Sequence, residues 1–278
     1  MPNTLPNNDT DIVILAAGKG TRMQSDLPKV LHKLAGRPLL GHVINAAKTI
    51  CDAEQIIVTG HGAELVEKTF VDSGGQFVQQ IEQLGTAHAV NMAAPHLRDQ
   101  SKVLILYGDV PLIKPATIAK MLAAVEGKTI GLLTINLENP MGYGRIVRNE
   151  AGMIESIVEQ KDASEEQRAV QEVNTGVIAA PASLLTTLLS RVNNQNAQAE
   201  YYLPDVLGIA REDGMTVNVV VSEDPAEILG VNNRLQLEEL ERILQQRLAE
   251  KLLLDGVAVS DRRRLDIRGE LTCGEGVS

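Results

Sequence analysis

Tryptophan is absent from the sequence, and cysteine occurs only at Cys51 and Cys273. Two cysteines supply neither a disulfide framework nor a cysteine-based metal site, and such low usage is typical of a reducing cytoplasm. No apolar run reaches the roughly 18 residues that a membrane-spanning helix needs. The polar start, MPNTLPNNDTD, does not resemble a signal peptide. We therefore expect a soluble, cytoplasmic chain.

Positive charge is also scarce, because 26 Lys and Arg residues stand against 36 Asp and Glu residues, a net charge of −10. Nucleic acids and anionic membranes would repel such a chain, so both are excluded as general partners and any basic site must be local. The histidines have no zinc-binding spacing, and no G-x-S-x-G motif occurs. Zinc enzymes and triad hydrolases are therefore disfavoured.

What the sequence does contain is a regular alternation of strand-like and helix-like segments. With 278 residues, 44% of them hydrophobic, it can form one large α/β domain or a domain with an appendage. Continuous apolar runs predict strands buried on both faces, and hence a doubly wound, mostly parallel, Rossmann-like sheet. The strands are DIVILAA, QIIVTG, QFVQQ, KVLILY and IGLLTIN, with helices around 40–50, 61–71, 86–97 and 115–126.

The pattern changes after Tyr143. Two alternating strands are predicted around a turn at Glu150–Gly152, and the segments VNTGVIAA and MTVNVVV follow as further strands. We expect these late strands to be antiparallel additions that form the wall of a ligand site.

The C-terminal part differs again. NNRLQLEELERILQQRLAEKLLLDG predicts one amphipathic helix that acts as a connecting arm. Beyond it, aliphatic residues recur every six positions, as in a parallel β-helix; the alternative is chance spacing in a polar tail. The repeating residues are Leu265, Leu271 and Val277, with Ile267 and Cys273 in a second register. We expect a main domain over 1–232, an arm over 233–256 and the first coils of a β-helix over 257–278.

A glycine- and cation-rich loop, LAAGKGTRMQSDLPKVL, follows the first strand. Glycines let backbone N–H groups approach a ligand, and the cations attract negative charge, so this loop predicts an anion site. It would lie at the carboxyl ends of the strands, where open α/β sheets bind ligands. Met23 stands where a Walker loop or a dinucleotide fingerprint needs glycine. The alternative is a simple glycine turn, but Lys29, fixed behind Pro28, favours the anion site.

A carboxylate follows another strongly apolar strand, in the segment LYGDVP. Asp109 would reach the same edge of the sheet as the glycine loop. One carboxylate beside phosphates is a common way to hold Mg²⁺. The alternative is a turn aspartate that binds its own backbone before Pro111.

These motifs resemble a known family. LAAGKGTRMQSDLPK is similar to the hallmark of the sugar-nucleotide pyrophosphorylases, L-A-A-G-x-G-T-R-M followed shortly by P-K. The segments QLGTAHA, LYGDVPLI, GYGRIVR, IVEQKDA, EVNTG, AEYYLPD and GVNNRLQL resemble, in order, motifs of the N-acetylglucosamine-1-phosphate uridylyltransferases, one half of a bifunctional bacterial enzyme. The resemblance covers residues 11–278. It implies synthesis of UDP-N-acetylglucosamine and pyrophosphate from UTP and N-acetylglucosamine 1-phosphate, for cell-wall and lipopolysaccharide precursors.

The resemblance also implies roles for single residues. Arg22 and Lys29 are the expected catalytic cations on the UTP phosphates, and Asp109 and Asn232 the expected Mg²⁺ ligands. Gln80, with Gly85 and Thr86, is expected to read uracil, because its side-chain amide offers both a donor and an acceptor. The other expected nucleotide contacts are Leu15, Ala16, Ala17, Gly18, Tyr107 and Gly108. Those with the sugar are Gly144, Glu159 and Asn174, although Glu159 alone fits a surface salt bridge equally well.

The family continues into a long left-handed β-helix that carries acetyl transfer and the contacts of a trimer. Since this chain ends in the first coils, the resemblance implies no acetyltransferase activity and a monomer or weak oligomer. Three alternatives remain for the function, one of which, a structural role for the C-terminal coils, would coexist with the enzyme. Another sugar-1-phosphate nucleotidylyltransferase is disfavoured by QLGT and VNN, and a non-catalytic sugar-nucleotide-binding module by the presence of Lys29 and Asp109.

Overall fold

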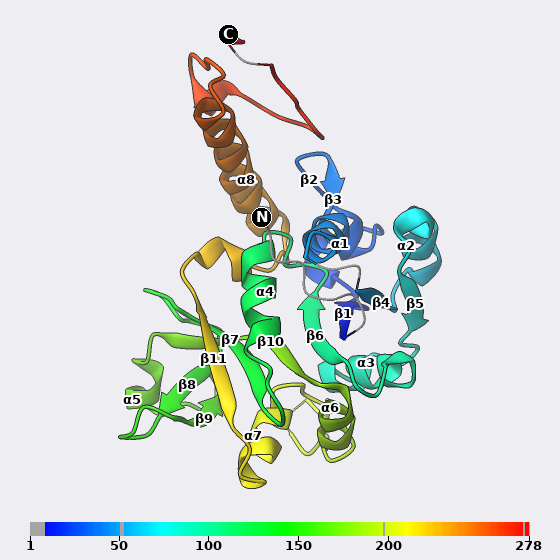
Figure 1. The fold of residues 1–278 in the computed structure, drawn as a ribbon, viewed down its shortest axis with the longest axis vertical. Coiled ribbons are helices and arrows are strands. Elements are labelled where there is room, and N and C mark those ends of the chain that lie inside the picture. The colour runs from blue at the N-terminus through cyan, green and yellow to red at the C-terminus, as the bar shows by residue number, and fades with distance from the viewer. Residues whose placement is uncertain (1–8, 51–52, 197, 275, 278) are drawn as a thin grey trace.

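A computed structural model describes residues 9–50, 53–196, 198–274 and 276–277, so Cys51 lies outside the described part. Its centre is a sheet in the order β11-β7-β10-β6-β1-β4-β5, with a β8–β9 hairpin attached to β10 (Figure 1). The strands are β1 (Thr10–Ala16), β4 (Glu54–Thr59), β5 (Gln76–Gln79), β6 (Lys102–Tyr107), β7 (Ile130–Asn136), β8 (Arg145–Arg148), β9 (Ile154–Val158), β10 (Glu172–Pro181) and β11 (Val217–Ser222). All the predicted strands are confirmed. A small separate hairpin joins β2 (Lys33–Leu34) and β3 (Arg37–Pro38).

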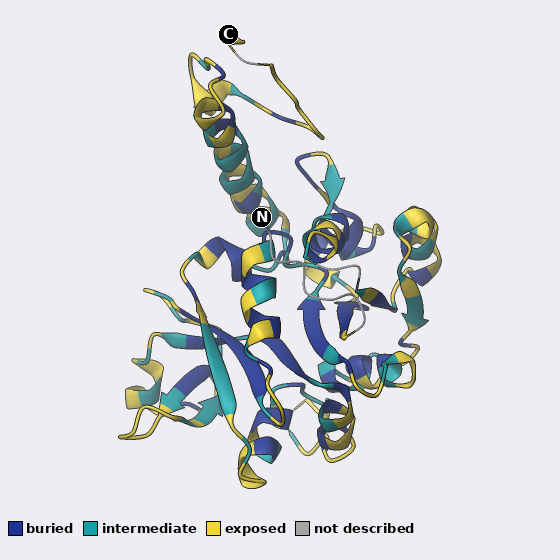
Figure 2. Ribbon diagram, viewed as in Figure 1, coloured by how far each residue is buried: buried dark blue, intermediate teal, exposed yellow. Residues whose placement is uncertain are grey.

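Helices cover both faces of this sheet. On one face α1 (Leu39–Lys48), α2 (Ala63–Thr69) and α4 (Pro115–Ala123) bury apolar side chains against alternate residues of β1 and β6. On the other face the covering helices are α3 (Thr86–Ala93), α6 (Ala182–Leu189) and α7 (Asp205–Glu212). Figure 2 shows the resulting dark blue, buried strands between the layers. The doubly wound, mostly parallel α/β fold is therefore confirmed.

The late strands need one correction. β10 is antiparallel to both β6 and β7, and β8 and β9 form the expected antiparallel hairpin beside it. β11, in contrast, runs parallel to β7. The reason is topological. β10 runs antiparallel to β7, and after α6 and α7 the chain returns as β11, which runs opposite to β10. β11 pairs with β7 at the edge of the sheet, and the two strands therefore have the same direction.

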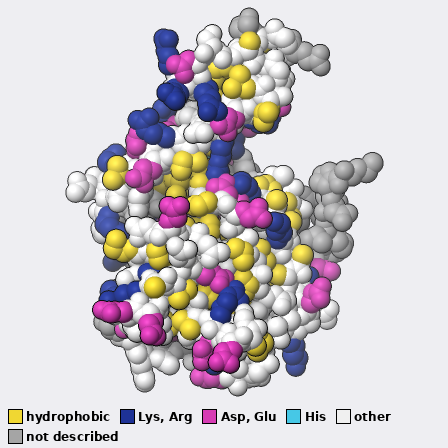
Figure 3. Space-filling view, turned by 90° about the vertical axis from the view of Figure 1, so that its left-hand side faces the viewer, with side chains coloured by type: hydrophobic (Ala, Val, Ile, Leu, Met, Phe, Trp, Pro, Cys, Tyr) yellow, Lys and Arg dark blue, Asp and Glu magenta, His cyan; other side chains and the backbone are white. Residues whose placement is uncertain are grey.

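The predicted arm is helix α8 (Arg234–Leu254). The Asn233 side chain caps its start by accepting a hydrogen bond of 2.9 Å from the Gln236 N–H. Its first turns pack on Met23, Leu34 and Leu39 in a separate apolar cluster. On the face of the molecule in Figure 3, Lys and Arg side chains gather on this protruding arm. The run Arg262–Arg264 forms a 3-10 helix beyond α8.

The tail after α8 turns back along the arm. Ile267 packs with Leu252 and Val257, and its backbone exchanges hydrogen bonds with the Gln245 side chain. The Gly269 N–H donates to the Ala35 carbonyl at 2.9 Å, which joins the tail to the β2–β3 hairpin. No strand occurs among the described residues of this tail. The β-helix start and the three-part division of the chain therefore stay predictions. No helix within the described ranges has the length and apolarity to cross a membrane.

A buried carboxylate closes the amino end of the sheet and yields a stability prediction. Asp11, 0% exposed, accepts hydrogen bonds from Arg98 Nε at 2.8 Å and Ser101 Oγ at 2.5 Å. We expect Asp11→Ala to lower the free energy of unfolding by about 3–5 kcal/mol, because it leaves a partly buried cation without its partner. Urea unfolding measures this. Asp99→Ala, at an exposed site on the same loop, is the matched control, and an equal loss in both variants would contradict the assignment.

Candidate active site

The glycine loop after β1 is shaped by close contact with Lys29. Gly20 has φ +62°, and a Cβ there would lie 2.6 Å from the Lys29 Cβ, so only glycine fits. A 3-10 helix, Thr21–Met23, follows, and Met23 is buried in the cluster beneath α8. The side chain that breaks the Walker pattern is thus a structural anchor, and it leaves the neighbouring Arg22 exposed.

Four of the predicted residues meet at one point. Lys29 forms an ion pair with Asp109, and its Nζ also donates to Asn232 Oδ1 at 3.2 Å. Arg22 Nη2 donates to the same Asn232 oxygen at 2.9 Å. The segments that carry them follow β1, follow β6 and precede α8. A hydrogen bond of 2.9 Å from the Val231 N–H to the Asp109 carbonyl holds the last two segments together.

The charge of this cluster suits an anion. Two cations face one carboxylate, so the group carries a net positive charge in a protein that is otherwise acidic. A cavity of about 500 Å³ opens beside it and is lined by Arg22, Tyr107, Asp109 and Asn232. Burial, and then the nearby charge of Asp109, raise the pKa of Tyr107, so its hydroxyl stays protonated and donates to the Gly176 carbonyl at 3.3 Å.

The end of β1 presents backbone rather than side chains. Leu15, Ala16 and Ala17 are buried, whereas Gly18 is exposed at the start of the loop. The Gly108 N–H donates to the Leu15 carbonyl at 2.9 Å, which fixes the Tyr107–Gly108–Asp109 turn against β1. The structure therefore places all these predicted contacts along one edge of the sheet.

Gln80, the residue predicted to read uracil, directly follows β5 and is 3% exposed. Its Nε2 donates to the Gly85 carbonyl at 3.1 Å and pairs with His88 Nδ1 at 2.9 Å. Both hydrogens of the amide are thus engaged inside the protein. Gln80 cannot also donate to a ligand as arranged here, which differs from the expectation that it offers both a donor and an acceptor.

A neighbouring segment supports the Gly85–Thr86 turn. Tyr201 donates its N–H to the Leu84 carbonyl at 2.8 Å and accepts from the Ala87 N–H at 2.9 Å. Gly85 has φ +114°, and a Cβ there would lie 2.4 Å from the Tyr201 carbonyl oxygen. The AEYYLPD segment, which carried no predicted role, is therefore what holds the turn in place.

The three predicted sugar contacts also lie together. The Asn174 N–H donates to the Gly144 carbonyl at 2.8 Å, and a Cβ on Gly144 would lie 2.9 Å from Glu159 Oε1. Partial desolvation raises the pKa of Glu159, and the charges of Asp162 and Asp205 act in the same direction, against Arg145. The structure gives Glu159 no salt bridge within the described residues, which leaves its carboxylate free for a ligand.

Arg145 is a residue that the sequence interpretation missed. Only 2% exposed, it donates to the Tyr143 carbonyl and to Gln160 Oε1. It therefore fixes the neighbours of both Gly144 and Glu159. The motif GYGRIVR includes this arginine, but nothing in the spacing indicated that it is buried.

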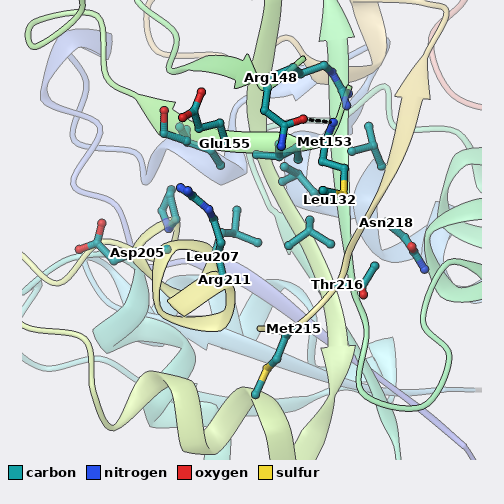
Figure 4. Close-up of a pocket in the computed structure, with 18 of the residues that line it drawn as sticks. Leu132, Arg148, Met153, Glu155, Asp205, Leu207, Arg211, Met215, Thr216 and Asn218 are labelled. Atoms are coloured by element: carbon teal, nitrogen blue, oxygen red, sulfur yellow. Dashed lines mark hydrogen bonds between the residues drawn. The ribbon is translucent and has the colours of Figure 1, made fainter. Parts of the chain in front are cut away.

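A second cavity, of about 1000 Å³, lies between the β8–β9 hairpin, β11 and α7. Figure 4 shows Arg148 and Met153 of the hairpin region on one side and Leu207 and Arg211 of α7 on another. Of the predicted site residues, only Glu159 lines it. We assign the chemistry to the smaller cavity instead, since that one is lined by Arg22, Asp109 and Asn232 of the convergent cluster.

Comparison with known proteins identifies the family of the chain. The chain is 52% identical over 268 residues to the bifunctional protein GlmU of Thiobacillus denitrificans, a match that covers 96% of this chain and 58% of that protein. The chain thus spans little more than half the length of this curated relative. A solved nucleotidyl transferase from Methanothermobacter is similar in structure, with a TM-score of 0.63, 21% identity, and coverage of 87% of this chain and 100% of that one. At this identity the structural likeness supports the fold alone.

A sequence profile described as the MobA-like NTP transferase domain matches residues 12–255. That range contains the glycine loop, the Asp109 turn and Asn232. The chain belongs to the family of MobA-like NTP transferase domains.

Proposed function

We propose that this chain transfers the uridylyl group of UTP to N-acetylglucosamine 1-phosphate, giving UDP-N-acetylglucosamine and pyrophosphate. The observation that carries the proposal is the convergence of Arg22, Lys29, Asp109 and Asn232 beside a glycine loop. The GlmU relative supports the choice of substrates. UTP is a cytoplasmic metabolite, so we infer that the reaction takes place there and supplies cell-wall and lipopolysaccharide precursors.

The chemistry asks little of the protein beyond position and charge. An oxygen of the sugar phosphate attacks the α-phosphorus of UTP in line, and the bond to the leaving pyrophosphate breaks. A phosphate monoester dianion needs no general base, so catalysis depends on orientation and on neutralising the charge that develops. Arg22 and Lys29 would donate to the phosphate oxygens for this purpose. In binding UTP, Lys29 would exchange its bond to Asp109 for a phosphate.

The donor set also fits Mg²⁺. Asp109 and Asn232 present oxygens that both bind one cationic atom, Lys29 Nζ, so a cation already occupies the point where their oxygens meet. A carboxylate and an amide oxygen suit Mg²⁺, which takes few protein ligands and completes its shell with water and phosphates. The bound ion would act as a template and Lewis acid. When Lys29 moves to the phosphates, Asp109 and Asn232 are left free to hold it.

The direct test measures pyrophosphate release from each nucleoside triphosphate paired with each sugar 1-phosphate. We expect UTP with N-acetylglucosamine 1-phosphate to be the preferred pair, with UTP favoured over CTP by at least about a hundredfold, because the wrong base leaves buried polar groups unpaired. Preference for another base or sugar would favour a related nucleotidylyltransferase. Binding without turnover of any pair would favour a non-catalytic module.

Removal of either cation should affect turnover more than binding. We expect Lys29→Ala and Arg22→Ala to lower kcat by about a hundred- to a thousandfold, because each contact acts on charge that appears at the reacting phosphates. Steady-state kinetics measures kcat, and calorimetry the affinity for UTP. Lys19→Ala, an exposed lysine of the same loop, is the control. Near-normal kcat in the Lys29 variant would refute its role.

The proposed metal site gives a separate prediction. Asp109→Asn keeps the shape of the side chain but removes its charge, so we expect at least about a hundredfold loss of Mg²⁺-dependent turnover with the fold retained. Asn232→Ala should act similarly but more mildly, because a neutral amide is the weaker ligand. A Mg²⁺ titration of activity, beside circular dichroism, checks this. Asp26→Asn, in the exposed part of the loop, should behave as the wild type.

A further inference from the structure

His88 makes a contact that neither the motifs nor the proposed reaction uses. It lies in α3, one turn after Gly85, and its Nδ1 is 2.9 Å from Gln80 Nε2. The second contact of that amide nitrogen is the Gly85 carbonyl, at 3.1 Å. Gln80 is thus held from two sides, by the turn and by the helix that follows it.

These two contacts fix the orientation of the amide. A carbonyl oxygen only accepts, so the atom of Gln80 that faces Gly85 must be the nitrogen. The same nitrogen then donates its second hydrogen to His88, whose Nδ1 must be unprotonated. The imidazole is therefore neutral and carries its hydrogen on Nε2.

The amide oxygen is what remains for a ligand. Gln80 Oε1 has no hydrogen bond within the described residues. Three side-chain atoms in this part of the chain are both fully enclosed and without a hydrogen bond, namely His32 Nε2, Gln55 Oε1 and Arg145 Nε, and Gln80 Oε1 is not one of them. It therefore keeps some exposed surface although the residue as a whole is buried. In that arrangement Gln80 is purely an acceptor.

We propose that His88 determines nucleobase choice by holding Gln80 with its oxygen toward the base; this inference rests on the proposed UTP site. Uracil carries a hydrogen on N3 and can donate to that oxygen, whereas N3 of cytosine has a lone pair there and is repelled. The Gly85 N–H, for which the described part of the chain provides no acceptor, is a fixed donor for O4 of uracil and would face the amino group of cytosine. His88 touches no reacting atom and is a positioning residue.

The test compares variants that differ in the acceptor at position 88. His88→Phe keeps a ring but removes Nδ1, whereas His88→Asn places Oδ1 where Nδ1 was. We expect the ratio of kcat/KM for UTP to that for CTP to fall about three- to tenfold in His88→Phe, the worth of one hydrogen bond, and to be restored in His88→Asn. The kcat with saturating UTP should stay near that of the wild type.

The chain provides a matched control. Gln76 Nε2 and His96 Nδ1 form the same kind of pair at 2.7 Å, but on the exposed surface. His96→Phe should leave the UTP to CTP ratio unchanged. An unchanged ratio in His88→Phe would overturn the proposal. This includes the case in which kcat/KM falls equally for UTP and CTP, which is what a merely structural role would give.

A spectroscopic measurement keeps the test independent of how the variants fold. The ¹⁵N shifts of the wild-type imidazole should report an unprotonated Nδ1 and a protonated Nε2 at neutral pH, and a hydrogen on Nδ1 would contradict the proposed orientation. The two possible failures are separable. A wild-type protein that does not use UTP refutes the proposed function, whereas a wild-type protein that prefers UTP with a ratio insensitive to His88 refutes only this inference.

Discussion

The contact among Lys29, Asp109 and Asn232 is the constraint on which the rest of the structure depends. It joins three segments that are distant in sequence, and it can form only if the ends of β1 and β6 and the start of α8 reach one edge of the sheet. Under the proposed reaction the contact would be exchanged, because its partners are a cation and two oxygens that suit the phosphates and the metal of a metal–triphosphate complex. Without such a ligand the protein satisfies its own charges, which avoids leaving a partly buried carboxylate without a partner.

Hydrogen bonds and ion pairs brace the framework around this contact. Glu227, 3% exposed, accepts a hydrogen bond from Thr117 and an ion pair from Lys114 at 3.2 Å, which anchors the segment before Asn232 to the start of α4. Asp224 adds an ion pair to Arg247 of α8 at 2.6 Å. Desolvation raises the pKa of Asp224, but the contacts with Lys114, the Ala226 N–H and Arg247 together outweigh it and hold this pKa below its usual range, so this brace stays charged. Asn232 is therefore presented from a fixed backbone, and only side chains need to move.

The sequence predicted the strands, the glycine loop and the grouping of site residues because each depends on local pattern or on motif order. It could not predict the direction of β11, because apolar alternation records burial but not the neighbour beside which a strand lies. Nor could it predict the state of Gln80, since the donors of that amide are consumed by Gly85 and His88, whose positions depend on the Tyr201 segment more than a hundred residues away in sequence. The six-residue repeat after α8 likewise did not reveal the local structure. The aliphatic residues recur as the pattern requires, but Ile267 packs against the arm, and no strand occurs in the described part of that tail.

Three parts of the candidate site use polar groups in different ways, and the difference fits what each is proposed to recognise. Phosphates carry charge but little shape, so an exposed arginine, Arg22, and a partly buried lysine, Lys29, suit them. The edge of a base is distinguished by the positions of its donors and acceptors, and reading it requires a side chain of fixed orientation. Gln80 is held by two hydrogen bonds without a ligand, which would suit that task. A sugar offers hydroxyls on a flexible set of angles, and here Arg145 fixes the backbone on either side while the Glu159 carboxylate stays free. Burying a guanidinium without a carboxylate partner is costly, and its Nε has no bond within the described residues. Its other donors bind the Tyr143 carbonyl and Gln160 Oε1, so the guanidinium offsets part of this cost by fixing the residues next to Gly144 and Glu159.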